Sequence, residues 1–306
     1  MQPWIDVRFS AIDGAIPQSY RGVTMKDRVT ALLLLCLLQA ASAANAQDKV
    51  FDLHVHLWEG EKSVQGYLSQ LGETNQQVTR FGGIWMARLG ELEETRRKND
   101  ELIALAVKHA RMMPIASIHP YDGQAAFDEL KRIVDRGVRV IKLHPHTQKF
   151  DVTDPRVPAL CKLAGELGVI VLMDNANIIA GDSENLFNLA VGTPKTRFVF
   201  THMGALNFRF WNIVPLARTA GDFWPDNIYF EISAIVELAA DSPIEQEFIW
   251  TIRNVGIDRV MLGSDYPQMS LAQAVDALER LDLNRSEKDK ILYGNAQTLF
   301  APKTPD

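Results

Sequence analysis

From residue 50 onward, short apolar runs alternate with longer segments whose apolar residues recur at spacings of three and four. Apolar runs of strand length followed by amphipathic helices are typical of βα units and a parallel sheet. The expected strands are 50–56, 83–87, 113–118, 138–144, 169–174, 198–202, 228–233 and 260–265. Several of these runs are apolar throughout, as expected for strands that are covered on both faces.

Segments with helical periodicity follow these strands. The expected helices are 89–112, 124–136, 155–167, 184–191, 206–220, 243–255, 271–281 and 286–300, the last with Ser286 as its N-cap. This alternation predicts an α/β protein with a single-domain (β/α)8 TIM barrel. Segment 59–86 is the least regular, and its glycines favour a loop over the barrel mouth.

The N-terminal region has the layout of a secretory signal peptide. Charged residues follow Met25, an apolar run covers 31–38, and A-x-A sites end at Ala43 or Ala46. We therefore expect an upstream extension over 1–24, a signal peptide over 25–46, and the barrel over 47–306. The alternative is an amphipathic or membrane-anchoring N-terminus.

Composition argues against some classes of binding partner and indicates the cellular compartment. The chain has 306 residues, of which 47% are hydrophobic and 23% charged, and these fractions are typical of a globular protein. Its net charge of -6 and the absence of a Lys/Arg block argue against nucleic acid and anionic membrane partners. After signal cleavage only Cys161 remains, so no internal disulfide can form. Export without disulfides favours a periplasmic or secreted location.

Two histidines near the start of the barrel are candidates for metal binding. His54 and His56 are separated by one residue in an expected strand, so their side chains point the same way. Two aligned imidazoles form half of a metal site. The alternative is a purely structural pair of histidines.

Other polar residues lie at equivalent positions, where the expected strands end. In a TIM barrel, the C-terminal ends of the strands carry the catalytic residues. Five of the seven histidines of the chain lie there, which favours one shared site. The polar residues at these ends are His54, His56, His119, Lys142, His144, Asp174, His202 and Asp265.

Four segments, taken in order, resemble the amidohydrolase superfamily. They are DLHVH at 52–56, THMG at 201–204, GSDYP at 263–267 and YGNAxxLF at 293–300. The chain is most similar to the amidohydrolase-related branch that includes aminocarboxymuconate-semialdehyde decarboxylase. The resemblance implies that His54, His56 and Asp265 bind a divalent metal, with zinc expected and manganese as the alternative. It also implies that His202 is a further ligand or the acid/base residue.

One position departs from the family pattern. The fifth strand of the family usually ends in a metal-ligating histidine, and Asp174 stands at this position. A carboxylate can also bind zinc or manganese, so Asp174 is either a metal ligand or has another role. Lys142 or His144 could replace the missing metal-ligating histidine. Alternatively, both residues, together with Arg88, could bind a substrate carboxylate. For Lys142 the structural alternative is an ion pair with Asp174 or Glu231.

The favoured function is a metal-dependent hydrolase of a small amide, lactone or ester. A divalent cation lowers the pKa of bound water from about 15.7 toward about 7, and Asp265 or His202 would accept the proton. One alternative is metal-dependent non-oxidative decarboxylation of a small carboxylic acid, with His202 protonating the ring carbon. Another is a metal-free binding or scaffold barrel. The expected partner is a small-molecule substrate, and the resemblance also allows a homodimer.

Overall fold

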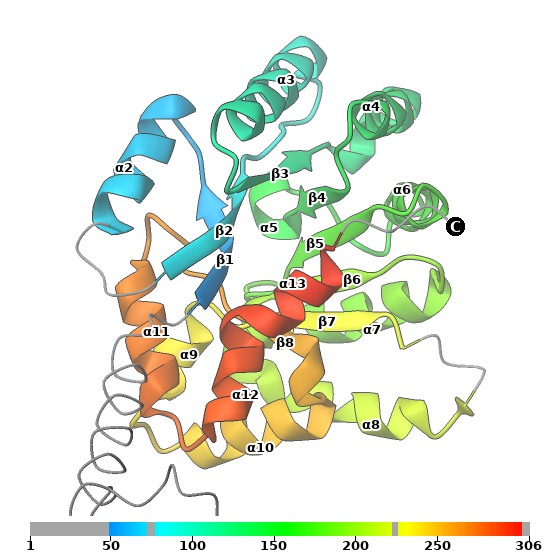
Figure 1. Ribbon diagram of the computed structural model, residues 1–306. Helices are drawn as coiled ribbons and strands as arrows, with labels where there is room; N and C mark the ends of the chain where they lie inside the picture. Colours follow the sequence, from blue (N-terminus) through cyan, green and yellow to red (C-terminus); the bar gives the residue numbers. More distant parts are fainter. Residues whose placement is uncertain (1–48, 72–76, 222–225, 302–306) are drawn as a thin grey trace, which may run out of the picture. The chain divides into compact units, whose positions relative to one another are not determined.

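The computed structural model describes residues 49–71, 77–221 and 226–301 (Figure 1). The upstream extension and the signal peptide predicted for residues 1–46 lie outside the described residues, so both stay predictions, as does the periplasmic location. No helix in the described ranges is long and apolar enough to cross a membrane.

Eight parallel strands pair with their neighbours in chain order, from β1 to β8 (Figure 1). Their bounds are β1 Lys49–His56, β2 Gln77–Ile84, β3 Met112–Ser117, β4 Val140–Leu143, β5 Ile170–Asp174, β6 Phe198–Thr201, β7 Ile228–Glu231 and β8 Val260–Met261. Every pairing is parallel, which requires a crossover between successive strands. The predicted TIM barrel is confirmed.

The sheet closes on itself through the residues that follow β8. The Leu53 backbone N–H donates to the Leu262 carbonyl at 3.2 Å, and the His56 N–H donates to the Tyr266 carbonyl at 2.8 Å. The Tyr266 N–H returns a bond of 3.2 Å to the His54 carbonyl. These contacts place the segment that carries Asp265 directly beside β1.

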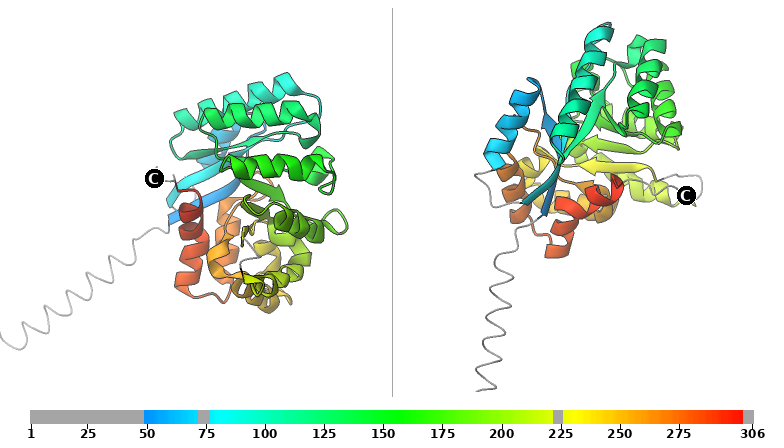
Figure 2. Two further views of the ribbon diagram at one scale, coloured as in Figure 1. Left: turned by 90° about the vertical axis from the view of Figure 1, so that its right-hand side faces the viewer. Right: turned by 45° about the horizontal axis from the view of Figure 1, so that its top comes forward.

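Helices cover the outside of the strands, as the two further views show (Figure 2). The α-helices are α2 Glu61–Leu71, α3 Leu92–Lys108, α4 Gln124–Asp135, α5 Pro145–Gln148, α6 Arg156–Glu166, α7 Asp182–Gly192, α8 Ile213–Arg218, α9 Ile235–Ala239, α10 Glu245–Val255, α11 Leu271–Arg280, α12 Arg285–Asp289 and α13 Asn295–Leu299. Single turns of other helix types are η2 Pro120–Asp122, η5 Ile257–Arg259 and η6 Lys290–Gly294, and η3 His202–Asn212 is a longer irregular segment.

The loop predicted for segment 59–86 is wrong. This segment contains helix α2 and the whole of strand β2, and the barrel therefore has a regular first βα unit. Tyr67 and Val64 are buried against the barrel, so α2 packs as an amphipathic helix. The last predicted helix is also divided into α12, η6 and α13, and its N-cap is Asn284 rather than Ser286 because the Asn284 side chain accepts from the Glu287 N–H.

The apolar core has two parts, one between helices and strands and one inside the barrel. The inner part is closed at the N-terminal end of the strands by α13, whose last residues pack against it. Leu299 and Phe300 belong to the same apolar cluster as Met113, Val140 and Ile170. The C-terminal ends of the strands are left for polar side chains.

Candidate active site

Three side chains meet where β1 approaches the segment after β8. His54 and His56 lie on the same side of β1, with ring centroids 4.9 Å apart. Asp265 Oδ1 lies 3.3 Å from His54 Nε2 and 3.1 Å from His56 Nε2. Because these three ligand atoms lie within 4.8 Å of one another, they form a group that could hold a metal ion. We refer to His54, His56 and Asp265 as the metal cluster.

A buried carboxylate orients the first histidine of the metal cluster. Glu231, the last residue of β7, places Oε2 at 2.9 Å from His54 Nδ1. If Nδ1–H donates to this carboxylate, Nε2 keeps a lone pair for a metal. His54 Nε2 is buried and has no hydrogen-bond partner among the described residues. A divalent cation would satisfy this nitrogen, so the residues present fit the metal.

The charge state of the metal cluster also suits a cation. Burial lowers the pKa of His54 well below its usual value, and the positive charge of Lys142 adds to this effect. Burial likewise lowers the pKa of His56, although the hydrogen bond to Asp265 opposes it. Burial raises the pKa of Asp265, but the charge of His54 and the His56 hydrogen bond outweigh it and leave a pKa of about 2. Neutral imidazoles and an ionised carboxylate are the forms that bind metal ions.

Asp174 lies in the same cavity but outside the metal cluster. Its Oδ1 lies 3.3 Å from His202 Nε2, and its Oδ2 lies 3.4 Å from His144 Nδ1. Burial lowers the pKa of His202, but the hydrogen bond and charge of Asp174 outweigh it and raise this pKa to about 9. Asp174 is therefore the counter-ion of His202, whereas burial lowers the pKa of His144 to about 4; the predicted role of Asp174 as a metal ligand stays a prediction.

His202 was predicted as a ligand or as an acid/base residue, and its surroundings leave both roles open. Its Nδ1 lies 3.1 Å from the Ser233 carbonyl oxygen, which can accept the Nδ1 proton. His202 also belongs to a second group, with His54 and Glu231, that is close enough to hold a metal ion. In that group the Glu231 carboxylate already contacts His54 Nδ1. A metal held there would therefore leave His54 Nε2 without a partner.

Of the three predicted substrate-binding residues, the structure brings only His144 to the cavity. Lys142 is fully buried and donates from Nζ to Thr201 Oγ1 at 2.8 Å. Burial lowers the pKa of Lys142, although the charges of Asp174 and Glu231 oppose this. The Arg88 side chain is 80% exposed, and its one ion pair with a described residue is a 4.0 Å contact to Glu91. Lys142 is therefore buried inside the barrel without lining the cavity, and Arg88 lies in solvent.

The cavity has a volume of about 250 Å³ and opens at the C-terminal ends of the strands. Trp58 forms part of its wall and stacks on His56, with ring centroids 4.8 Å apart and planes within 6° of parallel. The residues that line the cavity are His54, His56, Trp58, His144, Thr147, Asp174, Ala176, Ile178, His202, Ala205, Ala234, Asp265 and Gln268. A flat aromatic wall beside a metal cluster suits a planar substrate.

The backbone is strained where three strands enter the cavity. His202 after β6, Ala234 after β7 and Asp265 after β8 have φ angles of 62°, 64° and 58°. Each residue with a side chain in this left-handed region costs about 1–3 kcal/mol, and such strain is concentrated at functional sites. The geometry of the cavity is thus maintained against local backbone preference.

Sequence reasoning missed two carboxylates that support the metal cluster. Glu231 appeared there only as an ion-pair partner of Lys142, because the strand was predicted over 228–233 and β7 ends at Glu231. Asp52 accepts hydrogen bonds from the Ser264 N–H at 2.8 Å and from Tyr67 Oη at 2.8 Å. Burial raises the pKa of Asp52 to about 6, although these bonds oppose it. Asp52 thereby connects β1 to the segment that carries Asp265.

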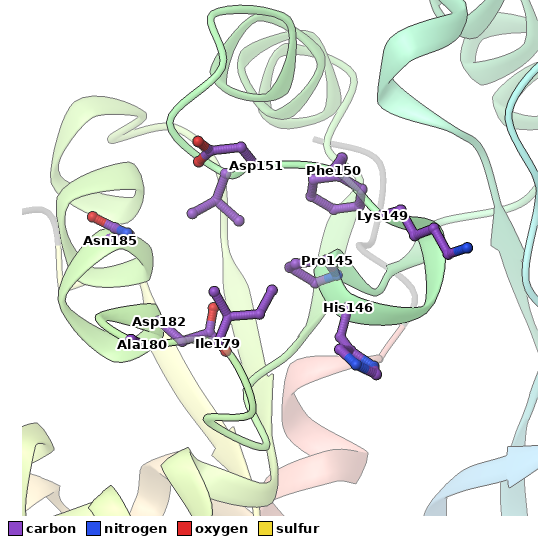
Figure 3. Close-up of a pocket in the computed structure, with 10 residues that line it drawn as sticks. Pro145, His146, Lys149, Phe150, Asp151, Ile179, Ala180, Asp182 and Asn185 are labelled. Atoms are coloured by element: carbon purple, nitrogen blue, oxygen red, sulfur yellow. The ribbon is translucent and has the colours of Figure 1, made fainter.

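Figure 3 shows a second cavity, which has a volume of about 370 Å³. Pro145, His146 and Phe150 border it on one side, and Ile179, before α7, and Asp182, its first residue, face them (Figure 3). The two cavities are lined by consecutive residues at 144–146 and 178–179. A substrate larger than the first cavity therefore has space beside it.

The amidohydrolase family model matches residues 51–301, so the chain belongs to this family and is an enzyme of the amidohydrolase superfamily. Gamma-resorcylate decarboxylase of Polaromonas sp. is 27% identical over 120 residues, which cover 35% of this chain. The matched part spans 35% of that curated relative.

Solved structures share the fold at lower identity. A structure from Staphylococcus aureus named as an amidohydrolase has a TM-score of 0.64 at 18% identity, covering 83% of this chain and 99% of the other. 2,6-Dihydroxybenzoate decarboxylase from Rhizobium has a TM-score of 0.60 at 18% identity, with coverage of 83% and 98%. Dihydroxybenzoic acid decarboxylase from Polaromonas sp., solved with manganese and 2-nitroresorcinol, has a TM-score of 0.55 at 17% identity, with coverage of 83% and 96%. At these sequence identities the solved structures show that the fold is shared and nothing more.

Proposed function

We propose that the protein is a metal-dependent, non-oxidative decarboxylase of a small aromatic carboxylic acid. The observation that carries this proposal is the presence of the metal cluster, the Trp58 wall and His202 in one cavity. The proposal is supported by the curated relative, a gamma-resorcylate decarboxylase, and by the dihydroxybenzoate decarboxylases that share the fold.

His54, His56 and Asp265 would hold the metal. Manganese is proposed in place of zinc because a decarboxylase of the same fold was solved with manganese. When bound, a divalent cation supplies positive charge that stabilises negative charge on substrate oxygens. Glu231 would keep the His54 ring oriented for this role through the contact at Nδ1.

The other cavity residues would bind the ring and deliver a proton. The indole of Trp58 offers a flat face to an aromatic ring, and the His144 imidazole can donate a hydrogen bond to an oxygen of the substrate. His202 would hold a proton at Nε2, next to Asp174 Oδ1. As the bond from ring carbon to carboxylate breaks, its electron pair stays on that carbon, which takes the proton from Nε2 while CO₂ leaves.

Hydrolysis, the function favoured from the sequence, is the competing outcome. The same metal cluster could serve a hydrolase, but the relatives named above whose reaction is known are decarboxylases. The two reactions differ in what His202 must do, because hydrolysis needs a base and decarboxylation needs an acid.

A direct assay separates the two reactions. The purified protein, loaded with Mn²⁺, is incubated with 2,6-dihydroxybenzoate and related hydroxybenzoates, and in parallel with aryl lactones and amides. We expect release of CO₂ and the corresponding phenol, reduced at least about 100-fold in Asp265→Asn and in His202→Gln. His109→Gln is the matched control, because that imidazole lies 3.0 Å from Glu61, outside the cavity. Lactone or amide hydrolysis without CO₂ release would replace the proposal with the hydrolase.

A further inference from the structure

The largest of the cavities described lies at the opposite end of the barrel from the metal cluster. It has a volume of about 540 Å³ and is lined by residues at the starts of β3 to β6, by Arg80 of β2 and by the end of α13. Figure 1 shows α13 crossing the barrel at this end. Cavities of about 300–1,000 Å³ commonly hold small molecules.

The inner surface of this N-terminal cavity is apolar. Met113, Val140 and Ile170 line it from the strands, and Leu299 and Phe300 line it from the end of α13. All five belong to the apolar cluster inside the barrel. A ligand that enters here can therefore place a hydrocarbon or aromatic group against the barrel interior.

Three arginines, Arg80, Arg139 and Arg197, add positive charge to the same cavity. Its lining within the described ranges includes no aspartate or glutamate, although the chain carries a net charge of -6. Arg139 donates from Nη1 to the carbonyls of Val134 and Val138 at 2.7 and 2.8 Å, which fixes its position. The cavity is thus a local positive region of an acidic protein.

All three arginines lack a protein carboxylate. In the described part of the chain, none of Arg80, Arg139 and Arg197 forms an ion pair, whereas most other arginines there do, and Arg139 bonds to backbone carbonyls instead. Arg80 lies 5.2 Å from the centroid of the Phe51 ring, and burial lowers its pKa. A guanidinium that loses water without gaining a carboxylate favours binding of an external anion.

We propose that this N-terminal cavity binds a small amphipathic carboxylate. The apolar part of the ligand packs against Met113, Val140 and Phe300, and its carboxylate accepts hydrogen bonds from Arg80 and Arg197. This site is separate from the proposed decarboxylation, because it uses the other end of the strands and none of the residues in the catalytic cavity.

Calorimetric titration with octanoate tests the site in the full chain. We expect octanoate to bind at one site per chain. The neutral analogue 1-octanol should have at least about tenfold lower affinity, because a hydrogen bond to a charged group is lost. Arg80→Gln and Arg197→Gln should each weaken octanoate binding by about tenfold. Arg97→Gln, an exposed arginine of α3 outside the cavity, is the matched control and should bind as the parent does.

Two further variants test whether a loss of octanoate binding comes from unfolding and whether octanoate binds at the metal cluster instead. Ala301→Trp extends from the end of α13 into the cavity, keeps every arginine, and should also weaken octanoate binding. His56→Ala alters the metal cluster and should leave octanoate binding unchanged. Equal affinity for octanol, no octanoate binding, or loss of binding in His56→Ala would overturn the proposal. Binding only after removal of residues 302–306 would also overturn it, by identifying that segment as the occupant.

Discussion

Glu231 Oε2 lies 2.9 Å from His54 Nδ1, and both side chains are almost completely excluded from solvent. The contact joins the end of β7 to the middle of the metal cluster. Buried carboxylates that hold a ligand histidine in this way determine its tautomer and ring orientation. The strength of metal binding should therefore depend on a residue that does not itself bind the metal.

Glu231→Gln should lower the affinity for Mn²⁺ by about 10–100-fold, because the amide holds the His54 imidazole less firmly. The affinity is measured by competition with a fluorescent chelator. Glu129→Gln is the matched control, since Glu129 is a buried carboxylate of α4 that contacts Asn99 and Arg132, outside the site. An unchanged affinity in Glu231→Gln would show that the histidine is held by other contacts.

Asp174→Ala and Asp265→Asn should differ in metal content. Asp174 contacts His202 and His144, whereas Asp265 belongs to the metal cluster. We expect about one metal ion per chain in Asp174→Ala, with turnover lost, and no stoichiometric metal in Asp265→Asn. Elemental analysis of protein purified without chelator measures both. Loss of metal in Asp174→Ala would show that Asp174 is a metal ligand, as the sequence predicts.

Gly263→Ala should destabilise the fold by about 1–3 kcal/mol, because the added methyl overpacks a rigid region. Its Cβ would lie 2.6 Å from Glu231 Oε1 and 2.7 Å from His54 Cβ. Gly192→Ala, at the end of α7, meets no atom within 4 Å and is the control. Urea unfolding gives both free energies, and equal values for the two variants would contradict the prediction.

Glu237→Gln should change how stability depends on pH. Burial raises the pKa of Glu237 from 4.5 to about 7, and the negative charge of Glu231 acts in the same direction. Between these values the folded state binds a proton that the unfolded state releases, so the contribution of Glu237 to stability falls as pH rises through about 7. The variant should therefore gain more stability over the parent at pH 8 than at pH 5.

Urea midpoints at the two pH values test this prediction. Glu166→Gln, an exposed glutamate at the end of α6, is the control and should show no pH-dependent gain. A constant difference between Glu237→Gln and the parent at both pH values would mean that this carboxyl titrates normally in the folded protein.

The barrel and the edge that carries the site could be predicted because both depend on local patterns. Strand ends are visible as apolar runs that stop at a polar residue, and His54, Asp174 and His202 were found in this way. Helix α2 was missed because only Val64 and Tyr67 along it are buried, which is too weak a periodic signal. Its internal Gly66 also favoured a loop.

The partners of each site residue could not be predicted in the same way. Whether Asp174 faces the metal cluster or His202 depends on the register of neighbouring strands and on side-chain orientation. The Glu231 contact with His54 joins residues 177 positions apart, and no local pattern specifies such a pairing. Lys142 was expected in the cavity because its strand position is inward, but its amine bonds to Thr201 inside the barrel and does not line the cavity.

The closure of the barrel also determines when the protein can first acquire its metal. Asp265 is separated from His56 by 209 positions, so the metal cluster is complete only when the last strand has docked beside the first. A nascent chain that still lacks β8 has the two histidines but not Asp265, the third member of the metal cluster. Metal loading is therefore a late event that follows folding of nearly the whole chain. Chelation during synthesis should then leave a folded apoprotein that can be reconstituted afterwards.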